Sequence, residues 1–347
     1  MVTDSLDVVI GVDTHRDAHS LALVRSRDGV LIAEQEQPAT RAGYRAALRL
    51  GKRAGERRLW ALEGTGSYGA GLARFLAERG ERVCEVERPA REGSRARLKS
   101  DSLDALRAAR AALAGQALAS PRAAGRREAL RVLLQAREGA VAIRRSGLNQ
   151  LRALVVSAPE ELRERLRGQS REALVSTCSH LRPHSRQQAE LYATALALRS
   201  IARRVEQATR EAAGLQAELA RFVCELAPQL LALAGVGPIS AAQVLVSWSH
   251  RGRLRSEAAF ARLAGAAPIP ASSGKTVRHR LDRGGDRQLN RALHTIVLTR
   301  RRGDVATIAY IARRVSEGKS ERDAVRCLKR YLARQLFRLL EAIPTVA

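Results

Sequence analysis

The sequence has few cysteines and no long uncharged apolar run. Its four cysteines are scattered, with no Cys-x-x-Cys pair and no metal-ligand spacing; they are Cys84, Cys178, Cys224 and Cys327. We therefore expect free thiols in a reducing cytoplasm. No apolar stretch reaches the roughly 18 residues of a membrane span, and the N-terminus lacks the charged-then-apolar pattern of a secretion signal. These absences predict a cytoplasmic protein that neither enters a membrane nor is exported.

Acidic side chains are also scarce. The 347 residues include 61 Lys and Arg but only 35 Asp and Glu, which gives a net charge of +26. Residues 1–120 carry a net charge of +4, and residues 121–347 carry +22. Codon bias can explain why only five of the basic residues are lysines, but it does not explain the net charge. The asymmetry predicts an enzymatic N-terminal domain followed by a region that binds nucleic acid, in a nucleoid-associated protein.

Short strands and helices alternate in the first third of the chain. Residues 7–13, 20–25, 30–35, 59–63 and 82–87 have the pattern of strands, and helices are expected at 40–55, at 68–79 and from 101 onward. Three strands, helix, strand, helix, strand and helix is the order of an RNase H-like α/β domain, here over residues 1–120. In that fold the strand that ends in Asp13 is central, and the strand that ends in Glu63 is its neighbour.

Four carboxylates occupy positions in this domain that a metal-dependent nuclease site would require. Asp13 and Glu63 each close an apolar strand, and Asp101 and Asp104 lie three residues apart on one helix face. Taken singly, Asp101 could be a favourable charge at a helix N-terminus and Glu63 a solvated strand end. Taken together, they form an all-oxygen ligand set that suits Mg²⁺ or Mn²⁺, the ions that assist phosphodiester cleavage.

Residues 101–225 have an almost wholly helical pattern, and we expect a helical linker and coiled-coil segment over 121–225. Its clearest part is an apolar seam at alternating spacings of three and four, formed by Leu198, Ile201, Val205, Ala208, Ala212, Leu215, Leu219 and Phe222. Such a seam favours self-association as a coiled coil. An amphipathic helix packed inside a monomeric bundle has the same spacing, so both interpretations remain open.

Residues 226–347 are expected to form a second, mostly helical domain. The stretch from Ala234 to Pro238 resembles the turn of a helix-hairpin-helix. Gly235 and Gly237 in that turn would let backbone N–H groups approach a phosphate. A simple turn between two helices would explain the same glycines.

A serine-containing loop lies farther along this domain. Ser272 and Ser273 precede Gly274 in a stretch bounded by proline and glycine. The cations that follow are Lys275, Arg278, Arg280, Arg283 and Arg287. A serine among cations could act as a nucleophile toward phosphorus. It could equally donate hydrogen bonds to a bound phosphate without reacting.

Several of these segments, in this order and spacing, resemble the insertion-sequence-110 family of DEDD transposases, which are bridge-RNA-guided recombinases. The resemblance covers roughly residues 7–340. It rests on Gly11-Val12-Asp13, Glu63-Gly64-Thr65-Gly66, Asp101-Ser102-Leu103-Asp104-Ala105, the Gly-Val-Gly turn and Ser272-Ser273-Gly274. It implies a RuvC-like N-terminal domain, a coiled-coil dimerisation segment and a C-terminal transposase domain over 226–347.

The same resemblance implies roles for individual residues. Asp13, Glu63, Asp101 and Asp104 match the metal-binding tetrad, and Ser273 matches the nucleophile, with Ser272 directly before it. The implied activity is cleavage and exchange of double-stranded DNA through a phosphoserine intermediate. A structured guide RNA selects the DNA, and the protein acts as a dimer or tetramer. Two alternatives from the residues alone are a junction nuclease that uses water and a non-catalytic nucleic-acid-binding protein.

Overall fold

The computed structural model describes residues 6–86, 101–115, 118–122, 124–271, 279–280, 282 and 284–343, without the side chains of residues 101, 102, 270 and 279. The chain divides into two compact units, Met1–Ala124 and Gly125–Ala347. Each unit is described by itself below.

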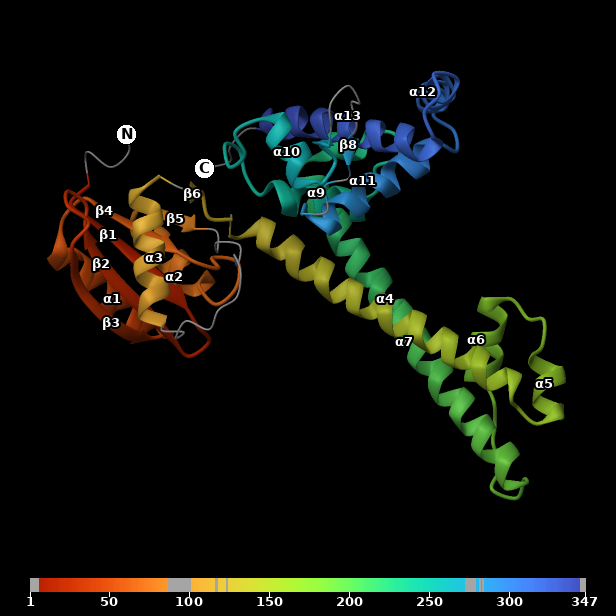
Figure 1. The fold of residues 1–347 in the computed structure, drawn as a ribbon. Helices are drawn as coiled ribbons and strands as arrows, with labels where there is room; N and C mark the ends of the chain where they lie inside the picture. The colour runs from red at the N-terminus through yellow and green to blue at the C-terminus, as the bar shows by residue number, and fades with distance from the viewer. Residues whose placement is uncertain are drawn as a thin grey trace. The chain divides into compact units, whose positions relative to one another are not determined.

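The first unit is a six-stranded mixed sheet with helices on both faces (Figure 1). Its elements are β1 (Val8–Thr14), β2 (Ala18–Arg25), β3 (Leu31–Pro38), α1 (Arg41–Ala54), β4 (Arg58–Leu62), α2 (Ala70–Ala77), β5 (Val83–Val86), α3 (Asp101–Leu113) and β6 (Leu118–Ala119). The strand order is β3-β2-β1-β4-β5-β6. β1 pairs antiparallel with β2 and parallel with β4. This arrangement confirms the predicted RNase H-like topology, with the strand that contains Asp13 near the centre.

The two faces of the sheet are covered by different helices, because successive side chains of a strand point to opposite faces. Val8, Ile10 and Val12 pack with Leu48 of α1 and Leu72 of α2 in one apolar cluster. The alternate positions pack on α3 in a second cluster that contains Val9, Val24, Leu59, Ala61, Ala109 and Ala112. All seven residues of β1 are buried, as expected for a strand covered on both sides.

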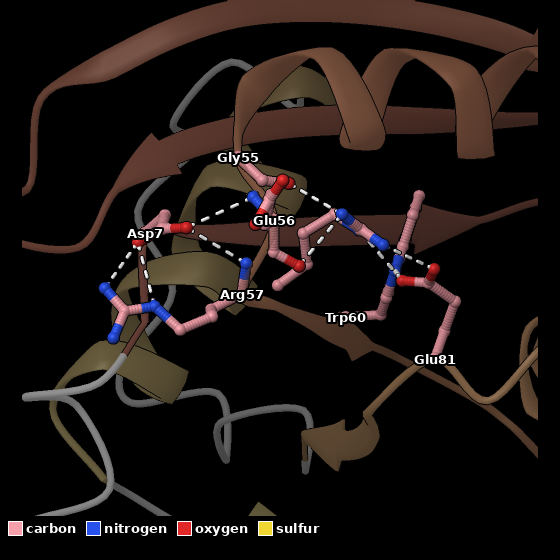
Figure 2. A network of polar contacts seen from close by, with 7 residues as sticks. Asp7, Gly55, Glu56, Arg57, Trp60 and Glu81 are labelled. Carbon is pink, nitrogen blue, oxygen red and sulfur yellow. Dashed lines mark hydrogen bonds and ion pairs between the residues drawn. The ribbon is translucent and has the colours of Figure 1, made fainter.

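Polar contacts fix the starting ends of β1 and β4 (Figure 2). The Asp7 carboxylate accepts hydrogen bonds from the backbone N–H of Glu56 at 3.1 Å and of Arg57 at 3.0 Å, and it pairs with the Arg57 guanidinium at 2.8 Å. Beside it, the Glu81 carboxylate accepts from Arg58 Nη2 at 2.7 Å and from Trp60 Nε1 at 2.9 Å. These bonds tie β4 to the starts of β1 and β5, at the end of the sheet opposite Asp13.

The described residues of the second unit form helices and one short pair of antiparallel strands (Figure 1). Its elements are α4 (Arg126–Val156), α5 (Glu160–Leu166), α6 (Arg171–Ser179), α7 (Ala189–Leu226), α8 (Pro228–Leu231), α9 (Pro238–Trp248), α10 (Glu257–Leu263), β7 (Ile269–Pro270), β8 (His279–Arg280), α11 (Arg287–Arg300), α12 (Val305–Ser316) and α13 (Glu321–Glu341). The 38 residues of α7 make it about 57 Å long, and it packs along α4.

One end of the α4–α7 pair belongs to the core of the C-terminal helices. Leu130 of α4 and Leu219 of α7 share an apolar cluster with Val244 of α9, Leu293 of α11 and Leu336 of α13. Residues 125–225 and 226–347 thus share a core within this unit. The domain boundary near residue 225 remains a prediction. Hydrophobic spacing along a continuous helix does not reveal which neighbours its ends contact.

The other end of the pair packs against α5 and α6. Leu151 of α4 and Leu198 of α7 form an apolar cluster there with Leu162 and Cys178. Between the two ends the helices come close, and a Cβ added at Gly147 would lie 2.5 Å from Val205 Cγ2.

The predicted apolar seam of α7 packs largely within the chain. Leu198, Val205, Ala208, Ala212 and Leu219 are buried, and α4 is the helix with which α7 makes its most extensive contact. For these residues the structure matches the intramolecular interpretation that the spacing left open. Self-association of the protein remains a prediction.

None of the described helices combines the length and the apolar character needed to cross a bilayer.

We predict that the Arg58–Glu81 ion pair stabilises the first unit. Replacing Glu81 with Gln leaves the largely buried Arg58 guanidinium without its counter-charge, which should lower the free energy of unfolding by on the order of 3 kcal/mol. Trp60 and Trp248 are the two tryptophans of the chain and lie in different units. Urea unfolding followed by Trp60 fluorescence in a Trp248→Phe background therefore measures this unit.

The control and the pH dependence make this prediction specific. Glu78→Gln removes a carboxylate whose side chain is 69% exposed and should change stability by less than about 0.5 kcal/mol. Burial would raise the pKa of Glu81, but hydrogen bonds from Arg58 and Trp60 hold it below the ordinary value of 4.5. The stabilisation is therefore complete above that value and is lost as the pH falls through the lower folded-state pKa. An undiminished difference between wild type and Glu81→Gln in strong acid would contradict it.

Candidate active site

Asp13 and Glu63 lie at the ends of adjacent parallel strands. The β1–β4 register ends with Val12 opposite Leu62, and the Glu63 N–H then donates to the Val12 carbonyl at 3.1 Å. The Thr14 hydroxyl donates back to the Glu63 carbonyl at 3.0 Å. By the alternation of side chains, Asp13 shares a face with Val9, and Glu63 shares a face with Ala61. Both belong to the face that α3 covers.

Gly11 lets α3 lie directly on this face. A Cβ at Gly11 would be 2.0 Å from the Ala105 carbonyl oxygen and 2.6 Å from the Ala109 nitrogen, so only glycine permits the helix backbone to come this close. The helix runs antiparallel to β1, because Val9 packs with Ala109 and Ala112 near the helix end. The first turn of α3 therefore lies toward the end of β1 that carries Asp13.

The carboxylates of α3 belong to this first turn. Asp101 begins the helix, and its side chain lies outside the described residues. Asp104 is half-buried, and its Oδ1 accepts from Arg107 Nη1 at 2.6 Å. Among the described side chains, no three His, Cys, Asp or Glu residues lie close enough together to hold a metal ion. The fold thus brings Asp13, Glu63 and the start of α3 to one end of one face of the sheet.

The chemistry of the donors fits a hard divalent cation. Asp13 is 3% exposed, and a buried carboxylate requires a compensating partner. His15 provides one, with Nε2 at 3.1 Å from Asp13 Oδ2. His15 was not among the site residues predicted from the sequence. Its position two residues beyond Asp13 is the pattern that could have identified it. Carboxylate oxygens from Asp13, Glu63 and Asp104 are ligands that Mg²⁺ and Mn²⁺ prefer.

The Gly-Val-Gly turn of the second unit has two glycines with different surroundings. Gly235 has a φ of +72°, and a Cβ there would lie 2.9 Å from the Ile296 carbonyl oxygen of α11, so close packing accounts for this glycine. The Arg300 guanidinium also donates to the Ala234 carbonyl at 2.8 Å. Gly237 lies in open space, and its N–H donates to Ser240 Oγ at 3.1 Å. Contact of either glycine with a phosphate remains a prediction.

Most of the serine loop lies outside the described residues. This applies to Ser272, Ser273, Lys275, Arg278 and Arg283. The flanking segments are described: β7 and β8 pair antiparallel, with Ile269 opposite Arg280. Farther out, the Asp286 N–H donates to the Leu263 carbonyl at 2.6 Å, and a Cβ at Gly285 would lie 2.3 Å from the Gly265 nitrogen. The two chain segments that enclose residues 271–278 in sequence are thus held together.

The predicted nucleic-acid ligands Arg280 and Arg287 are both exposed. Arg280 lines one cavity and Arg287 lines a second, and the two cavities share Lys329 and Arg326 of α13. Neither α13 residue was predicted as a ligand from the sequence. A signal was present for Lys329, because it falls at helical spacing among the buried residues Val325, Leu332 and Leu336.

We predict that Gly11→Ala destabilises the first unit and displaces α3. The added methyl group would overlap the Ala105 carbonyl, and overpacking of this kind costs roughly 1–3 kcal/mol. Unfolding monitored by Trp60 fluorescence should show the loss. Gly66→Ala is the matched control in the same unit, since a Cβ there would meet only the Arg122 side chain at 3.8 Å, an ordinary contact distance; it should change stability by less than about 0.5 kcal/mol. Equal stability of Gly11→Ala and wild type would refute the close contact.

Comparison with known proteins agrees with this arrangement. The profile of DEDD transposases of the IS110 type matches residues 10–158, and the profile of the transposase IS116/IS110/IS902 family matches residues 227–312. An insertion element IS110 uncharacterized 43.6 kDa protein from Streptomyces coelicolor is 34% identical over 116 residues, which are 33% of this chain and 29% of that relative. The aligned segment thus spans less than a third of the relative. The two profile matches, in this order on one chain, show that the chain carries the two domains of the IS110 transposase family, an RNase H-like DEDD domain followed by a largely helical C-terminal region.

Proposed function

We propose that this protein cuts and rejoins DNA strands of an insertion element, with a metal-binding carboxylate site in the first unit and a serine nucleophile in the second. The observation that carries the proposal is the placement of Asp13, Glu63 and the first turn of α3 at one end of one face of the sheet. The two profile matches support it.

The carboxylates of Asp13, Glu63, Asp101 and Asp104 hold Mg²⁺ or Mn²⁺ in this proposal. When bound, the metal polarises the phosphodiester and stabilises the departing oxygen. His15 holds the Asp13 carboxylate, and the Thr14 hydroxyl links the end of β1 to the Glu63 backbone. Arg107 pairs with Asp104, and its positive charge offsets part of the repulsion among the carboxylates.

Ser273 is the nucleophile in this proposal. Its hydroxyl loses a proton and forms an ester bond to the scissile phosphorus. The bond from phosphorus to one deoxyribose oxygen breaks, and that oxygen leaves as a hydroxyl after taking up a proton. Attack by the hydroxyl of another DNA end reverses these steps and releases the serine. The match of residues 227–312 to the transposase family and the cations around residue 273 support this role.

The partners in this proposal are double-stranded DNA and a structured guide RNA. The net charge of +22 on residues 121–347 supports phosphate binding by the second unit. RNA of this kind is recognised by its shape, and base pairing with the RNA selects the DNA. The protein acts as a dimer or tetramer. Because α4 covers much of the α7 seam within the chain, subunits meet largely through other surfaces.

We predict that Asp13→Asn, Glu63→Gln or Asp104→Asn reduces strand cleavage in Mg²⁺ by on the order of a hundredfold or more, since even outer-shell changes at metal sites cost roughly 10–100-fold. Affinity for DNA should stay nearly unchanged. The assay measures cleavage of a plasmid that carries the element ends, with the RNA transcribed from the element. Asp17→Asn is the matched control, because the Asp17 side chain is 77% exposed and pairs with Arg16. Full cleavage by the Asp13 or Glu63 variant would exclude the metal site.

We predict that Ser273 becomes covalently attached to DNA. A nicked substrate that traps the intermediate should give a protein–DNA band on a denaturing gel. Ser273→Ala should remove the band, and Ser272→Ala should retain at least part of it, which separates the two adjacent hydroxyls. A junction nuclease that uses water leaves free ends only. Cleavage without an adduct, together with activity of Ser273→Ala, would favour that enzyme instead.

A further inference from the structure

Lys329 is a cation on the buried face of α13. It is 8% exposed and lies at helical spacing among Val325, Leu332 and Leu336. Burial lowers the pKa of Lys329, and the charge of Arg326 lowers it further. A buried ammonium is costly unless it is paired and hydrogen-bonded. The buried ammonium of Lys329 therefore needs a group that balances its charge.

The partner that the structure gives Lys329 is neutral. Its Nζ donates to Asn290 Oδ1 at 2.8 Å, and Asn290 Nδ2 donates to the Ala264 carbonyl at 2.6 Å. This chain of bonds links α13, α11 and the end of α10. Lys329 forms no ion pair with any carboxylate in the described part of the chain. An ammonium has three donors, and Asn290 Oδ1 accepts one of them.

Cavities surround Lys329. One of about 480 Å³ and another of about 400 Å³ share Gly265, Asp282, Arg326 and Lys329 in their linings. Both volumes are in the range of roughly 300–1,000 Å³ that is usual for ligand sites. The larger cavity is also lined by Arg280, Lys319 and Arg330. Its carboxylates are Asp282 and Asp323, and Asp323 is already paired with Arg326 at 2.7 Å.

These cavities adjoin the segments that flank the serine loop in sequence. The walls include Gly265 to Pro268, which lead into β7, and Arg280 and Asp282, which follow residues 271–278. A ligand in the cavity would thus lie beside both ends of that loop. The surplus of cations in the lining favours an anion.

We propose that Lys329, together with Arg280 and Arg330 of the larger cavity, forms a binding site for a backbone phosphate of the nucleic-acid strand beside the serine loop. The phosphate supplies the negative charge that Lys329 lacks within the protein, and its oxygens accept from the remaining ammonium donors. Lys329 is a positioning residue, because it holds the strand without touching the reacting atoms. The identity of the anion as a phosphodiester rests on the proposed function.

The test begins with the unaltered full-length protein. The chain has five lysines, so protein labelled with ¹³C at lysine Cε gives few NMR signals, and Lys329→Arg identifies the one from Lys329. Thymidylyl-thymidine, a dinucleotide with one phosphodiester, should shift that signal. Its methylphosphonate analogue, which has the same shape without the charge, should not. The signal of the exposed Lys52 in α1 is the internal control.

Inorganic phosphate distinguishes the two sources of the anion. Binding of a nucleic-acid strand predicts saturation by the dinucleotide at a lower concentration than by free phosphate, and the reverse order would replace the phosphodiester with free phosphate as the ligand. A Lys329 signal that does not move with either anion would overturn the proposal and leave Lys329 with a structural role alone.

Variants test the same site through DNA binding. Lys329→Met should weaken duplex binding roughly tenfold, the effect of losing one charge-assisted hydrogen bond, and should lower the slope of log affinity against log salt by about one. Lys329→Arg should restore that slope, and Lys52→Met should leave both quantities unchanged. Trp248, in the same apolar cluster as α13, reports whether the Met variant is folded.

The outcomes separate this inference from the proposed function. If wild-type protein cleaves DNA but neither its Lys329 signal nor the salt slope of Lys329→Met responds, only the phosphate site is wrong. If Lys329 responds to the dinucleotide but the protein never cleaves DNA with its RNA and Mg²⁺, the phosphate site stands and the catalytic proposal fails.

Discussion

The contact between Gly11 and the backbone of α3 is the constraint on which the candidate active site depends. Side chains normally separate a helix backbone from the sheet on which it packs, but here the Ala105 carbonyl oxygen would lie only 2.0 Å from a Cβ at Gly11. The positions of Asp13 and Asp104 follow from backbone packing, since each lies within two residues of this contact. Because the backbones are so close, even the short side chains of aspartates can approach a common metal ion. The rest of the sheet keeps β1 and β4 in register.

Contacts at the starting ends of the strands also help to position Asp13 and Glu63. Asp7 and Glu81 hold the first residues of β1, β4 and β5 through bonds to backbone N–H groups and to arginine and tryptophan side chains. Parallel strands that are fixed at their starts and equal in rise end together. The alignment of Asp13 with Glu63 therefore begins at residues that are far from any proposed chemistry.

Secondary structure could be predicted from the sequence where a periodic pattern of apolar residues is compatible with only one type of element. The bounds of β1, which is buried on both faces, and of the alternating β5 were predicted to within a few residues. The order of elements that defines the RNase H-like unit was also predicted. The two-residue strands β6, β7 and β8 were not predicted, because two residues carry no period. The spacing of α7 could not show whether α4 or another chain covers Leu198 and Val205, since the helix geometry is the same in both cases.

The candidate sites divide along similar lines. Asp13 and Glu63 could be recognised because a strand end is visible in the sequence, and their convergence follows from parallel pairing. Lys329 was missed because it is more than 40 residues beyond the segments that flank the serine loop, and a run of charges in a sequence shows only cations that are neighbours along the chain. Asp101 and Ser273 remain predictions, since the structure does not describe their side chains.

The close approach at Gly147 has a consequence for how the second unit assembles. Val205 fits against a backbone that offers no Cβ, and the residues one helical turn away on α7 are Ile201 and Thr209. A slip of α7 by four residues along α4 would move it about 6 Å. The longer Ile201 or the polar Thr209 would then lie against Gly147 in place of Val205. Gly147 thus selects one register out of the several that a repeating three-and-four pattern permits. That choice brings Leu151 and Leu198 together at one end of the helix pair and Leu130 and Leu219 together at the other.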